Sequence, residues 1–309
     1  MSRFFDFSDS DREKLERKIK ETWVDFRTDL TNKRFGYQEI DRAKECTFLK
    51  VYDEMFYKNR GFEFNTITVD ELKDLTIGRG VILGVEECPD YERFIPKEEF
   101  IREANRFSPP GVEWLYLAIG EEEQINKCSQ AECRAERGNR FGFCHFEFGS
   151  ECGDLKIVDL TIANDLSYDE LNKKLETHAQ EICKGEIRRA MHTRTISRDK
   201  SWQGNFKKTL IMWIVYTYSK LLSEQIFEPL DETDDKNVMY APFQTMAQYY
   251  ISCGYSGIIY GSTVCSGGSN LVLFDKGIAH PVGAVEDYII TWVVFKNILP
   301  YPAYPADEK

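Results

Sequence analysis

The sequence lacks the signatures of the common nucleotide-binding and hydrolase folds. No Gly-x-Gly-x-x-Gly segment links a strand to a helix, and the spacing of Gly78, Gly80 and Gly84 does not match that pattern. A phosphate-binding loop ending in Gly-Lys-Ser/Thr is missing, and so is the Gly-x-Ser-x-Gly turn of the α/β-hydrolases. We therefore expect neither P-loop chemistry nor a serine-hydrolase site.

Patterns of metal ligands are scarce as well. The four histidines are scattered, at positions 145, 178, 192 and 280. Four cysteines, at 128, 133, 144 and 152, lie near His145 in the sequence, but they contain no Cys-x-x-Cys pair, which a zinc site usually has. Cys144 and His145 are neighbours on a predicted strand, so their side chains point to opposite faces. We expect no metal site; buried free thiols are the favoured interpretation, with a metal site as the alternative.

Positive charge and long apolar runs are also in short supply. The chain has 40 Lys and Arg against 52 Asp and Glu, and the resulting net charge of −12 disfavours nucleic acid and anionic lipid as partners. The most apolar helical stretch, 209–219, is shorter than the roughly 20 residues of a membrane span. The first residues lack the apolar core of a signal peptide, and nine scattered cysteines suggest free thiols. We expect a cytoplasmic protein.

The pattern of the first 74 residues predicts a helical region. Apolar side chains recur at spacings of three and four between residues 8 and 30, on one face of a helix: Leu15, Ile19, Trp23, Phe26 and Leu30. A weaker helical pattern follows at 43–58. This region could cover a site, form a homo-oligomer contact or bind an inhibitor protein.

From residue 75 the pattern changes to a mixture of strands and helices. Strands are predicted at 76–84, 115–118, 141–148, 155–160, 257–260, 271–274 and 288–295. Helices are predicted at 121–135, 168–183, 206–227 and 243–253. The irregular order predicts an α+β fold with mixed or antiparallel sheets rather than a doubly wound one. We predict a main domain at 75–280 and a C-terminal strand with a Pro-rich tail at 281–309.

Two segments have the residues for a small-molecule site. In residues 105–134, a Pro-Pro-Gly turn leads into an apolar strand with Tyr116 and then into a helix that ends near Glu132. In residues 254–274, two apolar strands flank a loop of glycines and hydroxyl residues, where backbone can approach a ligand closely. Seen alone, Glu132 could be a solvated helix residue and the loop a plain hairpin.

Together the two segments resemble the RES-domain family. The pattern of that family includes Gly-Arg-x-Asn-Pro, Leu-Tyr-x-Ala, Ala-Glu-x-Arg, Leu-Lys-Ile-Val-Asp-Leu, a Gln-containing helix, Gly-x-Asp-Gly-Ile-x-Tyr-x-Ser and Gly-x-Asn-Leu-x-Leu-Phe. Corresponding segments occur here in the same order, at 105–109, 115–118, 131–134, 155–160, 243–244, 257–262 and 268–274. The chain departs from the pattern at Asn105, Ser108 and Ser256, which stand in place of Gly, Asn and Asp.

The resemblance implies an ADP-ribosyltransferase-like fold that binds NAD and cleaves its nicotinamide–ribose bond. It also implies a toxin or defence effector held in check by a cognate antitoxin. The catalytic residues it points to are Glu132, Ser262 and a strand arginine. We assign the strand arginine to Arg79, with Arg93 and Arg102 as competitors. The other residues expected to bind or support NAD are Arg106, Tyr116, Gln244 and Asn270.

Three functions remain open from the sequence. The first is an NAD glycohydrolase or phosphorylase, which transfers ADP-ribose to water or to phosphate. The second is an ADP-ribosyltransferase that modifies a protein. The third is a non-catalytic protein that binds NAD and acts through interactions.

Overall fold

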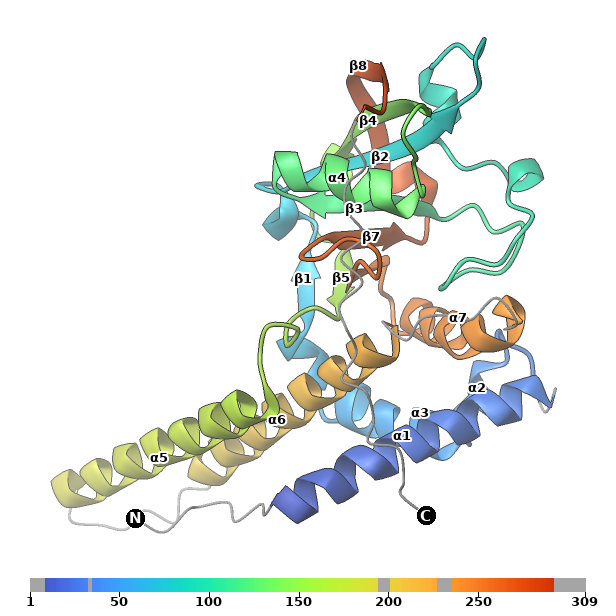
Figure 1. The fold of residues 1–309 in the computed structure, drawn as a ribbon. Coiled ribbons are helices and arrows are strands. Elements are labelled where there is room, and N and C mark those ends of the chain that lie inside the picture. The colour runs from blue at the N-terminus through green and yellow to red at the C-terminus, as the bar shows by residue number, and fades with distance from the viewer. Residues whose placement is uncertain (1–8, 33–34, 194–200, 227–234, 292–309) are drawn as a thin grey trace, which may run out of the picture.

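The computed structural model describes residues 9–32, 35–193, 201–226 and 235–291, and it has an α+β fold (Figure 1). The strands are β1 (Thr66–Thr68), β2 (Thr76–Leu83), β3 (Leu115–Gly120), β4 (Arg140–Phe148), β5 (Lys156–Asp159), β6 (Gly257–Gly261), β7 (Ser269–Leu273) and β8 (Ala279–Ile289). The helices are α1 (Asp9–Thr31), α2 (Ile40–Ala43), α3 (Thr47–Asp53), α4 (Glu122–Glu132), α5 (Tyr168–Thr193), α6 (Ser201–Ile226) and α7 (Lys236–Ser252). The prediction of an α+β fold with a mixed sheet is confirmed.

All eight strands belong to one sheet, in the order β1-β5-β6-β7-β3-β2-β4-β8. Only β5 and β6 run parallel; the other neighbouring strands are antiparallel. The join in the middle is short, because β2 and β3 pair only from Thr76 opposite Gly120 to Gly78 opposite Ala118. Beyond that point β2 continues to Leu83 beside β4, and β3 continues back to Leu115 beside β7. The sheet therefore divides into two halves that separate from residue 79 onward.

Small residues in β2 bring the neighbouring strand and helix close. A Cβ atom on Gly78 would lie 2.3 Å from the ring of Phe143, and one on Gly80 would lie 2.2 Å from the ring of Phe141. Both rings come from β4 and are buried together with apolar residues of α4. The glycines of β2 thus allow α4 to pack at the join of the two half-sheets.

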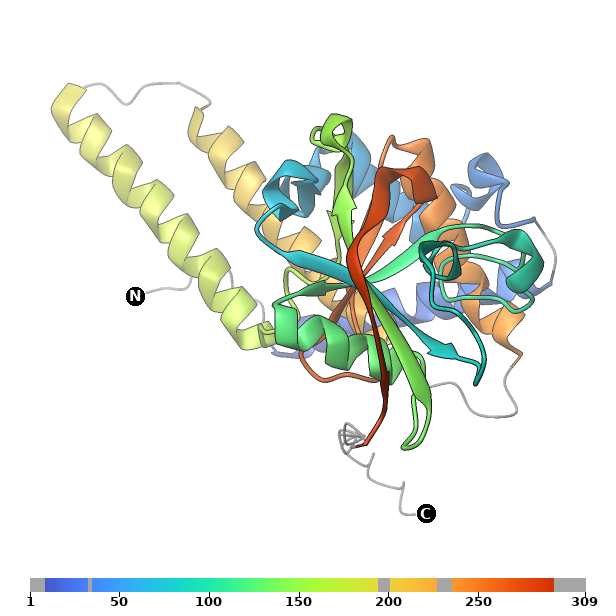
Figure 2. The same cartoon turned by 90° about the horizontal axis from the view of Figure 1, so that it is seen from above.

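The N-terminal helices and α6 and α7 cover the half of the sheet that contains β5, β6 and β7 (Figures 1 and 2). The predicted apolar face of α1 is buried at Ile19, Trp23, Phe26 and Leu30. Trp23 packs on Phe48 of α3 and on Phe243 of α7, with ring centroids 4.9 and 5.0 Å apart. The helical region is therefore part of the largest apolar core of the described chain.

Helices α5 and α6 lie side by side and project from the rest of the molecule in both views (Figures 1 and 2). At their base, Leu171 and Leu175 of α5 pack on Trp213 of α6. The predicted helix 206–227 is thus half of a helical hairpin. In the part of the chain that the structure describes, no helix is long and apolar enough to cross a membrane.

Some predicted boundaries differ from the observed ones. The last strand, predicted at 288–295, is β8, which already begins at Ala279 and ends at Ile289. Residues 290 and 291 are not part of a strand, and 292–295 lie outside the described residues together with the Pro-rich tail. Helix α7 begins seven residues before the predicted start at Phe243 and contains Pro242. The division at 74 and 280 stays a prediction; the sheet extends across both positions through β1 and β8.

Candidate functional site

A pocket of about 820 Å³ lies where the two half-sheets separate. Its walls come from β2 and β3, the C-terminal end of α4, the segment 103–106, the start of α7 and the loop between β6 and β7. Its polar and aromatic lining includes Arg79, Glu103, Arg106, Tyr116, Glu132, Arg134, Lys236, Tyr240, Tyr260 and Asn270. The volume is within the range of sites that hold drug-sized ligands and cofactors.

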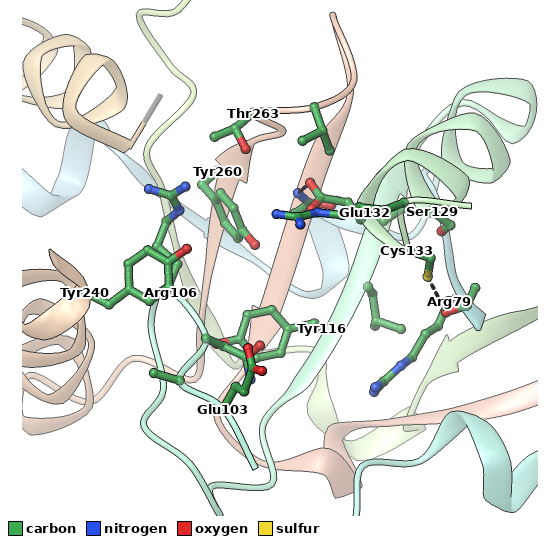
Figure 3. Close-up of a pocket in the computed structure, with 18 of the residues that line it drawn as sticks. Arg79, Glu103, Arg106, Tyr116, Ser129, Glu132, Cys133, Tyr240, Tyr260 and Thr263 are labelled. Atoms are coloured by element: carbon green, nitrogen blue, oxygen red, sulfur yellow. Dashed lines mark hydrogen bonds between the residues drawn. The ribbon is translucent and has the colours of Figure 1, made fainter. Parts of the chain in front are cut away.

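The carboxylate of Glu132 is held from one side only. Its Oε1 accepts hydrogen bonds from Ser262 Oγ at 2.8 Å and from Asn270 Nδ2 at 2.5 Å. Among the described residues, no hydrogen bond reaches Oε2, and the side chain is exposed. Glu132 therefore has a defined orientation and one oxygen available to a ligand (Figure 3).

The position of Ser262 follows from the hairpin of β6 and β7. Tyr260 pairs with Asn270, and Ser262 N then donates to Gly268 O at 2.8 Å. The Ser262 oxygen accepts from the backbone N–H groups of Val264 and Cys265, at 3.2 and 3.0 Å. The hydroxyl has a single hydrogen. Because the two backbone N–H groups are donors to the oxygen, this hydrogen remains for the bond to Glu132.

Arg79 is the first residue of β2 beyond its last pair with β3. Its Nη1 is buried, and within the described part of the chain no hydrogen bond to this atom is found. Burial lowers the pKa of Arg79 to about 10, so the side chain remains cationic at neutral pH. A buried guanidinium nitrogen without a hydrogen-bond partner costs free energy, which an anionic ligand in this pocket would offset.

Arg106 lies across the pocket from Arg79, beside Tyr240 (Figure 3). Its guanidinium carbon is 5.3 Å from the ring centroid of Tyr240 and 5.6 Å from that of Phe243, both on α7. Gln244, also on α7, donates from Nε2 to the carbonyl oxygen of Asn105 at 3.2 Å. Helix α7 thus positions the segment that contains Arg106 through stacking and through a hydrogen bond.

Two tyrosines contribute rings to the pocket. The Tyr116 hydroxyl is 2.9 Å from Ser108 Oγ, and burial raises the pKa of this tyrosine. Tyr260 is buried and its ring packs edge-on against Phe107, with centroids 4.9 Å apart. Its hydroxyl has no hydrogen bond to any described residue, and the ring points into the pocket (Figure 3). Tyr260 therefore offers a free hydroxyl to a ligand.

The pocket is cationic although the chain is acidic. Its charged lining consists of four basic residues, Arg79, Arg106, Arg134 and Lys236, and two acidic ones, Glu103 and Glu132. Glu103 forms an ion pair with Lys236 at 2.7 Å, between the 103–106 segment and the first turn of α7. Arg134 follows the C-terminus of α4 with φ of 51°, an uncommon conformation for a residue with a side chain.

The structure brings together most of the predicted site residues. Arg79, Arg106, Tyr116, Glu132 and Asn270 line the pocket, and Ser262 contacts Glu132 directly. Gln244 differs, because it lies behind the 103–106 segment and does not line the pocket. Among the competing arginines, Arg93 pairs instead with Glu87 at 2.5 Å, and Arg102 does not line the pocket.

The sequence prediction did not include four charged or aromatic lining residues, Glu103, Arg134, Lys236 and Tyr240, nor the free hydroxyl of Tyr260. Arg134 and Tyr260 do lie in the family-like segments 131–134 and 257–262, so the motifs contain a signal for both. Glu103, Lys236 and Tyr240 lie outside every quoted motif. Only the approach of α7 to the 103–106 segment places them here.

The described residues contain no group of three or more His, Cys, Asp or Glu side chains that could hold a metal ion, and the described cysteines are free thiols. In comparisons with known proteins, no protein-family model, no curated protein and no solved structure matches this chain.

Proposed function

We propose that this protein is a NAD-consuming enzyme that cleaves the bond between nicotinamide and ribose and transfers ADP-ribose to water or phosphate. One observation carries the proposal. A carboxylate with one free oxygen, Glu132, lies in the same pocket as a half-buried arginine, Arg79, whose buried Nη1 has no hydrogen-bond partner among the described residues. NAD needs both groups, because its pyrophosphate is anionic and its ribose becomes cationic as the bond breaks.

The chemistry of these residues suits that reaction. As the C1′–N1 bond breaks, its electron pair leaves with the nicotinamide nitrogen, and positive charge develops on the ribose. The free Oε2 of Glu132 would stabilise this charge or orient the attacking water or phosphate. Water or phosphate then attacks C1′ and loses a proton.

The remaining lining residues would hold the rest of the molecule. Arg79 and Arg106 provide planar groups for the pyrophosphate oxygens. Tyr116 and Tyr260 provide rings against which nicotinamide or ribose can pack, and Tyr260 also has a free hydroxyl. An enzyme of this kind would deplete NAD in the cytoplasm, so the proposal includes a cognate inhibitor protein.

A direct assay tests the proposal. Purified protein is incubated with NAD, and nicotinamide release is followed with and without inorganic phosphate. We expect nicotinamide to be released, with ADP-ribose as the second product in water and ADP-ribose 1″-phosphate if phosphate is the acceptor.

Two further measurements distinguish the alternative functions. NAD radiolabelled in its adenylate part is added to the protein together with a cell extract, and the proteins are separated on a gel. Label on a protein band would favour ADP-ribosyl transfer. Unchanged NAD in every arm, combined with measurable NAD binding by calorimetry, would favour a non-catalytic NAD-binding protein and would refute the proposed activity.

A further inference from the structure

Two thiols from distant parts of the chain meet beside the Glu132 site. Cys128 is on α4, one helical turn before Glu132, and Cys265 is in the loop between β6 and β7. A Cβ atom placed on Gly268 would lie 2.8 Å from the sulfur of Cys128 and 3.1 Å from that of Cys265. Both sulfurs therefore crowd against the same point, and the absence of a side chain at Gly268 leaves room for them.

The two thiols are also coupled chemically. The neighbouring Cys128 thiol lowers the pKa of Cys265 below its usual value. The same interaction raises the pKa of Cys128. A more acidic thiol next to a protonated one is the arrangement of an oxidation-sensitive cysteine with its resolving partner.

Cys265 lies in a loop whose neighbouring residues are exposed. Cys265 itself is buried, but its loop neighbours Val264, Ser266 and Gly267 are exposed. The side chain of Gln124 of α4 also lies here, with its Nε2 3.8 Å from the Cys265 sulfur. We expect a peroxide to reach the pair through these exposed loop residues.

We propose that Cys128 and Cys265 are an oxidation site that closes reversibly to a disulfide, cross-linking α4 to the β6–β7 loop at the edge of the pocket. The oxidant is a peroxide. The Cys265 thiolate attacks one peroxide oxygen, which gives a sulfenic acid and releases the other oxygen as water after it takes up a proton. The Cys128 sulfur then attacks the Cys265 sulfur, and the hydroxyl group leaves as a second water with the Cys128 proton. Two thiols lose two electrons and two protons, and one hydrogen peroxide becomes two waters.

The cross-link would act on the residues that hold Glu132. The Cys128 sulfur is a donor to Asn270 Oδ1 at 3.6 Å, and the backbone N–H of Cys265 donates to Ser262 Oγ. Asn270 and Ser262 are the two donors to Glu132 Oε1. Forming the disulfide removes the thiol hydrogen from Asn270 and pulls the loop that orients Ser262. We expect the oxidised protein to cleave NAD about tenfold more slowly, as for a weakened hydrogen bond to a charged group; this effect rests on the proposed function, whereas the cross-link does not.

Peptide mapping tests the cross-link. The reduced full-length chain is treated with hydrogen peroxide, unfolded in an alkylating reagent, digested without reductant and analysed by mass spectrometry. We expect one peptide pair joining Cys128 to Cys265, which disappears after treatment with dithiothreitol. The pair should persist in Cys88→Ser, which removes an exposed cysteine, and be absent in Cys265→Ser.

Each result has a defined meaning. Full alkylation of both cysteines after peroxide, or pairing of either with another cysteine, would overturn the inference whatever the protein does with NAD. A cross-link together with unchanged NAD turnover would overturn its control of the site. A cross-link in a protein that never cleaves NAD when reduced would leave the oxidation site supported and would count against the proposed function alone.

Discussion

Glu132 and Arg79 show opposite ways in which single residues are prepared for a ligand. Glu132 is exposed, but two neutral donors fix its carboxylate, so its orientation is set before a ligand arrives. Arg79 has a buried Nη1 that is without a hydrogen bond in the described chain, so part of its charge is unmatched until a ligand arrives. The first arrangement contributes preorganisation, and the second contributes binding free energy.

The role of Glu132 leads to a prediction about turnover. Glu132→Gln keeps the side-chain length and an oxygen that can accept from Ser262, but it removes the negative charge. We expect nicotinamide release to fall about 100-fold or more, the usual cost of losing one preorganised electrostatic group. Glu123→Gln, on an exposed position of the same helix, should retain activity. Circular dichroism should show both variants folded; full turnover in Glu132→Gln would refute the role.

Arg79 leads to a prediction that separates stability from binding. Arg79→Met replaces a half-buried cation with an apolar side chain, so the melting temperature should not fall. NAD affinity should fall about tenfold or more, because a charge-assisted hydrogen bond is lost. Calorimetric titration and thermal unfolding measure the two effects.

The matched control for Arg79 is Arg93→Met, which removes an arginine that pairs with Glu87 outside the pocket. It should leave NAD affinity unchanged, since Arg93 does not line the pocket. It should also change the melting temperature little, because a partly exposed ion pair contributes little to stability. The reverse result, with weaker binding in Arg93→Met and normal binding in Arg79→Met, would transfer the role of the strand arginine to Arg93.

At the scale of elements, α7 links the N-terminal helices to the pocket. Its Phe243 packs on Trp23 of α1 on one side and lies against the Arg106 guanidinium on the other. Its first two turns contribute Lys236 and Tyr240 to the pocket lining. The N-terminal region therefore supports the site through α7, in addition to any role in binding a partner.

A substitution in α1 tests this support. Trp23→Ala should lower the free energy of unfolding by about 3–5 kcal/mol, the cost of removing a large buried ring. Val24→Ala, on the exposed face of the same helix, should change it by about 0.5 kcal/mol or less. Urea unfolding measures both values, with far-UV circular dichroism as the signal because it does not depend on the fluorescence of Trp23. Similar values for the two variants would show that α1 is not part of the cooperative core.

At the scale of the whole molecule, the separation of the two half-sheets creates the pocket. The halves share only three opposed residue pairs between β2 and β3, and α4 packs over this join. Arg79 comes from one half, and Tyr116, Tyr260 and Asn270 come from the other. The join must therefore be rigid for residues of the two halves to keep their distance.

Overpacking the join should destabilise the molecule. Gly78→Ala places a methyl group 2.3 Å from the Phe143 ring, and we expect a loss of about 1–3 kcal/mol in the free energy of unfolding. Gly185→Ala is the matched control, since its Cβ meets no atom within 4 Å and the site is on helix α5. It should raise stability by about 0.5–1 kcal/mol. Equal effects of the two substitutions in urea unfolding would contradict the tight join.

The sequence pattern predicted the elements well where periodicity is strong. The buried face of α1 and the strands around Tyr116 and Asn270 follow from apolar spacing, because burial imposes a period on each element. The start of α7 was missed, since Lys236 and Asn237 are polar and Pro242 within the helix indicates a break. Strand β8 was placed too late, because its residues alternate weakly and many are exposed.

What the sequence by itself determined is the α+β character, the apolar faces and the candidate groups Glu132, Arg79 and Ser262, since each depends on local spacing or on a motif. Only the tertiary structure decided that β2 and β3 separate after three pairs, that Glu103 and Lys236 meet across the pocket, and that Cys128 and Cys265 lie together. These features join residues more than a hundred positions apart or depend on the register of a strand pair. Such contacts arise from packing of the whole chain, and no local pattern encodes them.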